Sequence, residues 1–159
     1  MLQASRPFQT SDLLNPGIPK SDVNEVWGMQ LQKWQYQCAY LDKWRVMEQE
    51  MGRETDAIIA PISPTGAIRH DQFKYCGYAL IFNLLNYTSV VVPVTFANRD
   101  TDRKIMDYQP LNKTDADVQA EYDPEAYHGA PVAVQVVGRR LSEERTLAIA
   151  EEVGRLLNI

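Results

Sequence analysis

Residues 88–96 read TSVVVPVTF, an almost unbroken apolar run rich in β-branched side chains. Such a run, in which polar residues do not alternate with apolar ones, predicts a strand covered on both faces. Two other short apolar runs predict strands as well, DAIIAP at 56–61 and VAVQVV at 132–137. We therefore expect three buried strands, with residues 89–94 at the centre of their sheet.

A long helix is predicted before the first strand. Ser21 or Asp22 can cap its first turn, and Gly52 can end it. Its apolar residues recur at intervals of three and four and form one stripe: Trp27, Leu31, Trp34, Cys38, Leu41 and Trp44. We expect this stripe to pack on the core, and a helix that recognises a partner is the alternative.

Two more helices are predicted between and after the strands. Residues 73–85 are apolar on most sides, which is typical of a helix inside a larger core. Ser142 can cap a final helix, in which Glu143 and Glu144 favour the N-terminal end. The inner face of this helix is predicted to hold Ile149, Val153 and Leu156 or Leu157.

The order of these elements indicates an α/β fold with helices on both faces of a mixed sheet. Residues 1–20 contain three prolines and are expected to form an extended arm, followed by one domain over 21–159. Residues 98–129 are polar and are expected to form an excursion over the surface. Three strands with bare apolar edges would aggregate, so we expect them to be part of a larger sheet.

Composition narrows the class of protein. The 159 residues carry a net charge of -5, which argues against a nucleic-acid partner. The N-terminal residues lack the apolar core of a signal peptide, and no run is long enough for a membrane span, so we expect a cytoplasmic protein. Cys38 and Cys76 are then expected to be free thiols, buried or nearly so.

Few residues carry chemistry on their own. Ser63, His70 and Asp71 have the composition of a catalytic triad, but triads depend on geometry, which adjacent residues do not supply. His70 and His128 lack the spacing and the cysteine partners of a zinc site. The chain has neither glycine-rich nucleotide motif. These patterns therefore carry neither a zinc-site nor a nucleotide-binding signature.

Three sequence motifs, in order along the chain, resemble the motifs of a known family. The first is DAIIAPISP at 56–64, the second is FNLLNYTSVVVP at 82–93, and the third is GAPVAVQVVG at 129–138. This chain resembles the C-terminal third of amidase signature enzymes, and its tryptophan-rich helix and RHDQFKYCGYA segment look most like the fungal acetamidase-like branch. The resemblance implies the C-terminal part of the amidase signature fold. The residues that carry it are Asp56, Pro61, Pro64, Phe82, Asn83, Pro93, Gly129, Pro131, Gln135, Val137 and Gly138.

The resemblance implies a function and its limits. Enzymes of this family hydrolyse carboxamides with a serine nucleophile, a bridging serine and a lysine base, without a metal or cofactor. The glycine- and serine-rich segment that holds these groups belongs to the N-terminal half of the family, and no stretch of this sequence matches it. No catalytic residue is therefore assigned, and we expect a C-terminal fragment of an amidohydrolase that is inactive alone.

The residues that do carry over are candidates for substrate binding. Ile62, Ser63, Pro64 and Thr65 follow the first strand and are implied to form the wall of the acyl pocket, although a proline-stiffened turn is an equal alternative. Tyr75 or Tyr78 could form a second wall, with core packing as the alternative. Gln135 is expected to be a structural hydrogen-bonding residue.

Two other functions remain open. The chain could be a non-catalytic binding or scaffold protein, or a small repurposed enzyme that uses His70, Tyr75 or His128 for acid–base chemistry. For the fragment, a small amide substrate is expected only when an N-terminal region completes the site. Self-association or a partner chain is expected to cover its apolar surface.

Overall fold

The computed structural model describes residues 20–69 and 75–157. The predicted arm at 1–20 therefore lies outside the described residues except for Lys20, and so do His70 and Asp71. The chain divides into two compact units, Met1–Gln35 and Tyr36–Ile159. The second unit contains every strand of the described residues and the helices that pack on them.

The described strands form a three-stranded sheet in the order β1-β3-β2. They are β1 (Ile58–Pro61), β2 (Thr88–Phe96) and β3 (Pro131–Gly138), close to the three predicted runs. Both β1 and β2 pair with β3 in antiparallel orientation, so this part of the sheet is antiparallel and not mixed. The prediction that β2 is central is wrong, because β3 lies between the other two. Strand order depends on pairing across long distances, which an apolar run does not encode.

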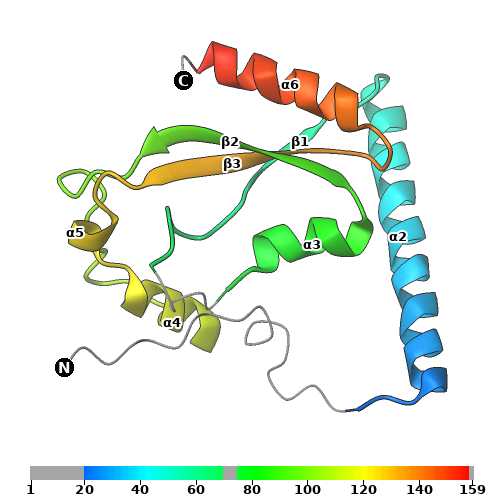
Figure 1. Ribbon diagram of the computed structural model, residues 1–159, viewed down its shortest axis with the longest axis horizontal. Coiled ribbons are helices and arrows are strands. Elements are labelled where there is room, and N and C mark those ends of the chain that lie inside the picture. The colour runs from blue at the N-terminus through cyan, green and yellow to red at the C-terminus, as the bar shows by residue number, and fades with distance from the viewer. Residues whose placement is uncertain (1–19, 70–74, 158–159) are drawn as a thin grey trace, which may run out of the picture. The chain divides into compact units, whose positions relative to one another are not determined.

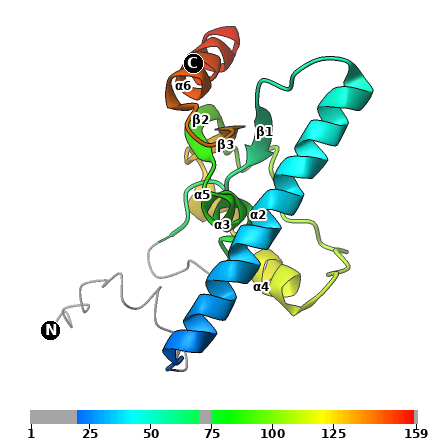
Figure 2. The ribbon, with the colours of Figure 1, turned by 90° about the vertical axis from the view of Figure 1, so that its right-hand side faces the viewer.

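Helices cover the two faces of β3. α6 (Glu143–Leu156) packs on one face, where Val92, Val136 and Ala150 form a buried cluster. α3 (Gly77–Leu85) packs on the other, where Phe82, Leu85 and Val137 form a second cluster. Figures 1 and 2 show the two helices on opposite sides of the strands. This arrangement confirms the expected α/β fold class.

Burial differs among the strands. Val136 and Val137 of β3 are fully buried, whereas exposed and covered residues alternate along β1 and through much of β2. Val91 of β2 is 51% exposed, although it lies within the apolar run. Of the three described strands, β3 alone therefore meets the expectation of a strand covered on both faces, because each helix covers only part of the sheet. Pro93 cannot donate a backbone hydrogen bond, and the register of β2 shifts between Pro93 and Thr95.

The long helix α2 (Val23–Met51) begins and ends where predicted. The Asp22 carboxylate accepts hydrogen bonds from the backbone N–H groups of Asn24 and Glu25, and Gly52 ends the helix with a φ of 67°. Of its described side chains only Trp44 is buried. Within the second unit, the expected core stripe is confirmed at Trp44 and wrong at Cys38, which is exposed, because periodicity shows which side of a helix is apolar and not what covers it.

The exposed members of the stripe include Trp27 at 66% and Trp34 at 60%. Cys38 is also exposed, which corrects the prediction of a buried thiol, while Cys76 is half-buried and both are free. In α6 the buried residues are Thr146 and Ala150, with Ile149 and Val153 packed beside them as predicted. Leu156, in contrast, is 65% exposed.

The polar segment 98–129 contains two helices that its composition did not predict. α4 (Lys113–Glu121) is capped by the Asn112 side chain, and α5 (Pro124–Tyr127) by that of Asp123. Tyr127 is almost fully buried and gives the segment an apolar anchor. None of the helices of the described residues is both long enough and apolar enough to cross a membrane.

Candidate functional site

The loop after β1 is shaped by short-range contacts. Pro61 ends the strand, and the Ser63 hydroxyl accepts a hydrogen bond of 3.4 Å from the backbone N–H of Thr65. Such side-chain turns are typical of serine before a bend. Ile62 and Ser63 are half-buried, whereas Pro64 is exposed. The loop therefore presents Pro64 outward at its tip.

Pro64 lines a pocket of about 560 Å³ together with Tyr75 and Tyr78. We call this the tyrosine pocket. The rings of Tyr75 and Tyr78 meet edge to face at 5.6 Å, and they lie at the beginning of α3. The other residues that line the pocket lie at the start of α4 or just before it: Leu111, Asn112, Lys113, Thr114, Asp115 and Val118.

A smaller pocket of about 180 Å³ shares Pro64 and Val118 with the tyrosine pocket. Thr65, Arg103 and Tyr122 also line it. The structure thus brings together Pro64, Thr65 and Tyr75 at two adjoining pockets. Ile62 and Ser63 are not among the described residues that line either of them.

The charged groups at the start of α4 are paired. The Tyr108 hydroxyl donates to the two Asp115 oxygens at 2.9 and 2.8 Å, and the backbone N–H of Leu111 donates to the same carboxylate. The hydrogen bond to Asp115, together with burial, raises the pKa of Tyr108 above its ordinary value. Tyr108 is therefore neutral at pH 7, and it holds the wall of the pocket in place.

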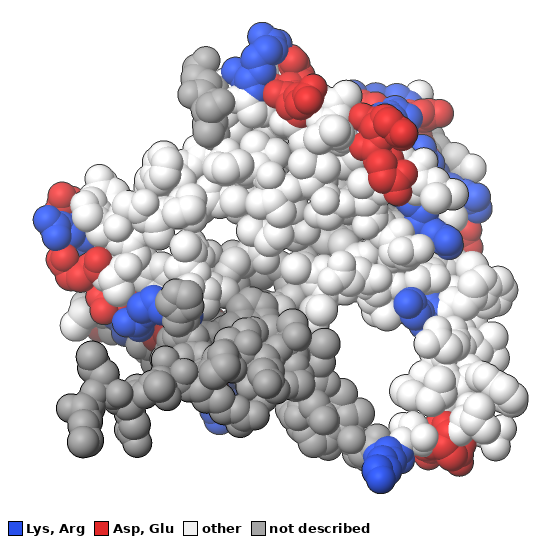
Figure 3. Space-filling model, viewed as in Figure 1, with Lys and Arg blue, Asp and Glu red and all other residues white. Residues whose placement is uncertain are grey.

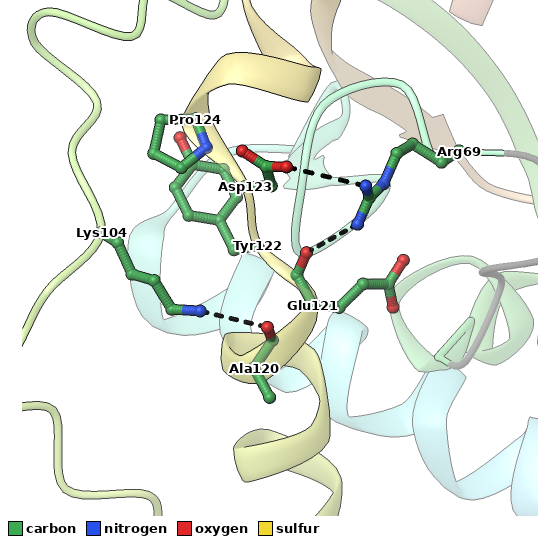
Figure 4. Close-up of a pocket in the computed structure, with 7 residues that line it drawn as sticks. All are labelled: Arg69, Lys104, Ala120, Glu121, Tyr122, Asp123 and Pro124. Carbon is green, nitrogen blue, oxygen red and sulfur yellow. Dashed lines mark hydrogen bonds and ion pairs between the residues drawn. The ribbon is translucent and has the colours of Figure 1, made fainter.

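A third pocket, of about 510 Å³, lies at the C-terminal end of α4 (Figure 4). The Arg69 guanidinium donates to the carbonyl oxygen of Glu121 at 3.2 Å, and Lys104 Nζ donates to that of Ala120 at 3.1 Å. Arg69 also lies 3.7 Å from the Asp123 carboxylate. Arg69 and Lys104 thus donate hydrogen bonds to carbonyl groups at the C-terminal end of α4, a structural role that stabilises this helix.

Sequence reasoning did not single out Arg69 or Lys104. Both are basic residues in polar segments, and their partners are backbone carbonyls of a helix far along the chain. No local pattern identifies such a partner. The tertiary structure alone assigns them to the end of α4.

Gln135 connects three elements beneath the candidate loop. It is only 1% exposed, and its Nε2 donates to the carbonyl oxygens of Pro61 and Tyr78 at 2.7 and 2.9 Å. Its Oε1 accepts a hydrogen bond of 3.1 Å from the Ser89 hydroxyl. The expected structural hydrogen-bonding role is in agreement with these contacts.

The residues of the repurposed-enzyme hypothesis do not converge in the described part of the chain. His128 is exposed, and its Nδ1 accepts a hydrogen bond of 3.4 Å from the backbone N–H of Arg99. His128 is not among the described residues that line the tyrosine pocket with Tyr75. Within residues 20–69 and 75–157, no group of three His, Cys, Asp or Glu side chains could hold a metal ion.

Comparisons with known proteins agree with the motifs. The family model described as Amidase matches residues 2–147. Acetamidases of Aspergillus oryzae and Emericella nidulans are each 66% identical to this chain over 146 residues, which is 92% of the chain and 27% of each relative. The chain therefore spans about a quarter of these relatives, and it corresponds to their C-terminal part.

A solved structure shares the fold. Fatty acid amide hydrolase superposes with a TM-score of 0.78 at 22% identity, over 90% of this chain and 25% of that protein. At this identity the likeness shows the fold alone. The family model and the two acetamidases lead to one conclusion: the chain belongs to the amidase family.

Proposed function

We propose that this chain is the C-terminal part of an enzyme that hydrolyses small linear carboxamides, and that it supplies one wall of the acyl pocket. Pro64, Thr65 and Tyr75 contact the acyl group in this proposal, while Ile62 and Ser63 hold the loop. The serine nucleophile, the bridging serine and the lysine base come from outside these 159 residues. Such an enzyme needs neither a metal nor an organic cofactor.

The observation that carries the proposal is the tyrosine pocket. Pro64 and Tyr75 belong to separate segments, yet they line one cavity of about 560 Å³. That volume lies within the range of about 300–1,000 Å³ typical of small-molecule sites. Aromatic and aliphatic groups from Tyr75, Tyr78 and Val118 line it beside polar groups of α4, which suits an apolar acyl group with a polar amide.

A segment exchange tests the proposal. The matching segment of the Aspergillus oryzae acetamidase is replaced by this chain, and hydrolysis of acetamide and benzamide is measured. We expect activity, and we expect Tyr75→Ala to change the ratio of kcat/KM for the two amides. Tyr36→Ala is the matched control, because Tyr36 is a half-exposed tyrosine on α2 that does not line the pocket. If the enzyme is active and Tyr75→Ala leaves the ratio of kcat/KM for the two amides unchanged, the assignment of the pocket is contradicted.

The 159-residue chain by itself is expected to hydrolyse neither amide above background. A fluorophosphonate probe is expected to label none of its serines, since no base has been assigned beside them. Labelling together with turnover would instead favour the repurposed enzyme. We place the protein in the cytoplasm, where the free thiols Cys38 and Cys76 would stay reduced.

A further inference from the structure

The carboxamide of Gln135 makes a polar connection between the sheet and two of the segments that line the tyrosine pocket. Pro61, its first partner, is the last residue of β1 and directly precedes the loop that begins at Ile62. Tyr78, its second partner, lies in the first turn of α3 and lines the pocket. One amino group therefore connects two of the segments that line the pocket.

The third hydrogen bond orients this amino group. The Ser89 hydroxyl donates to Gln135 Oε1, so the oxygen faces β2 and the nitrogen faces the two carbonyls. A buried amide is costly unless its donors and acceptor are satisfied, and here both donors and the acceptor have partners. The side chain consequently has one favoured orientation.

The hydrogen bond from Gln135 to the Tyr78 carbonyl of α3 is not duplicated by backbone hydrogen bonds of the sheet. β1 is attached to β3 by its own backbone ladder, in which Ala60 faces Gln135. α3 has no such ladder, and apolar contacts from Phe82 and Leu85 hold the later part of the helix. Apolar packing is weakly directional, whereas a hydrogen bond to the Tyr78 carbonyl restricts where the first turn lies.

We infer that Gln135 is a positioning residue for substrate binding: it sets the distance between the Pro64 loop and the Tyr75–Tyr78 pair, two of the segments that line the tyrosine pocket. The effect of Gln135 on substrate binding rests on the proposed function, because it follows only if the acyl group binds in this pocket. The positioning itself is a property of the isolated chain. It can therefore be tested separately.

Hydrogen–deuterium exchange of the 159-residue chain, followed by mass spectrometry, tests the positioning. Gln135→Met keeps the side-chain length and removes all three hydrogen bonds. We expect the Ile62, Ser63 and Thr65 amides and the first turn of α3 to exchange about tenfold faster, as for the loss of roughly one buried hydrogen bond. The C-terminal end of α3 is expected to change less.

Two controls separate positioning from general destabilisation. Val137→Ala creates a cavity two residues further along β3, among Phe82 and Leu85, and lowers stability without touching Pro61 or Tyr78. Gln37→Met removes a hydrogen bond of 2.6 Å to the carbonyl oxygen of Leu84, at the other end of α3. Neither variant is expected to accelerate exchange selectively in the first turn of α3. Equal acceleration in Val137→Ala and Gln135→Met would overturn the inference.

A milder variant covers the case in which Gln135→Met does not fold. Ser89→Ala removes the orienting hydrogen bond and leaves Gln135 in place, so we expect the same regions to exchange faster by a smaller factor. Unchanged exchange in the first turn of α3 in this variant would contradict the inference. In the exchanged-segment acetamidase, Gln135→Met is expected to raise KM for acetamide more than it lowers kcat. If the exchanged-segment acetamidase is inactive without any further substitution, the proposed function is wrong. The hydrogen–deuterium exchange measurements still test the positioning in that case.

Discussion

At the scale of a single residue, Gly77 leaves room for the side chain of Tyr75, which lines the tyrosine pocket. A Cβ atom at this position would overlap the hydroxyl of Tyr75 and lie 2.5 Å from its Cζ atom. The ring lies at the end of a flexible side chain, so it can move away at moderate cost. Gly77 therefore permits the ring orientation that lines the tyrosine pocket.

We expect Gly77→Ala to displace the Tyr75 ring and to change the near-ultraviolet circular dichroism of the chain. Stability is expected to change by less than about 1 kcal/mol, because alanine favours the helix while the ring is displaced. Gly28→Ala is the control, since no atom beyond its chain neighbours and its own helix backbone lies within 4 Å of the added Cβ. That variant is expected to leave the aromatic signal unchanged, and a change equal to that of Gly77→Ala would contradict the prediction.

Glu48 makes folding stability depend on pH. The backbone N–H of Thr55 donates to its carboxylate at 2.9 Å and lowers its pKa below the ordinary 4.5, against the opposing effect of burial. The Trp44 indole N–H and Arg139 lower the pKa further. A depressed pKa in the folded state stabilises the fold above the unfolded value, and this contribution is lost as the pH falls through the folded value.

The prediction is a steeper loss of stability for the wild type than for Glu48→Gln between about pH 5 and pH 3. Urea unfolding at several pH values measures it. Glu50→Gln is the matched control, because Glu50 is an exposed glutamate on the same helix, and we expect it to follow the wild type. Identical pH dependence of the wild type and Glu48→Gln would show that Glu48 does not contribute.

At the scale of the element, α2 carries three tryptophans in different environments. Trp44 is 3% exposed, packs edge to face on Tyr87 at 5.6 Å, and has the Arg139 guanidinium 5.9 Å from its ring. Trp34 lies on the same predicted stripe but is 60% exposed. Membership of the stripe therefore does not indicate an equal contribution to stability.

Trp44→Ala is expected to lower the free energy of unfolding by about 3–5 kcal/mol, the usual cost of removing a buried aromatic side chain. Trp34→Ala, the same substitution on the exposed part of the helix, is expected to change it by less than about 0.5 kcal/mol. Chemical denaturation of the two variants measures the difference. Equal losses would mean that Trp34 is covered in solution.

At the scale of the whole molecule, the described sheet leaves apolar side chains in solvent. Ile59, Val91 and Phe96 are 59%, 51% and 65% exposed, and β1 and β2 are the outer strands of the described sheet. Figure 3 shows few charged side chains over the strands and more of them around α6 and the polar excursion. Exposed apolar strands of this kind are typical of surfaces that bind another chain.

We propose that the isolated chain self-associates through these strands. Sedimentation velocity at low micromolar concentration is expected to show species larger than a monomer, together with binding of a dye that reports apolar surface. Val91→Lys and Phe96→Lys are expected to reduce both signals. Met106→Lys is the control, because Met106 is 89% exposed but lies in the polar excursion. A compact monomer with negligible dye binding would contradict the proposal.

The sequence alone determined most of the local elements and the family. The run 88–96 became β2 with the same bounds, and Asp22 and Gly52 mark the ends of α2. Strand propensity and helix capping depend on residues that are neighbours in the chain, so they can be read without a structure. The motif residues likewise identified the family before any fold was known.

The tertiary structure decided the strand order, the covered faces and the composition of the pocket. Gln135 donates a hydrogen bond to Pro61, which is 74 residues away. Residues of α4 line the tyrosine pocket, although the sequence of their segment indicated only a polar surface excursion. These contacts depend on how distant segments pack, and many packings share the same local pattern. For that reason the sequence predicted Pro64 and Tyr75 as site residues, but only the fold placed them in one cavity.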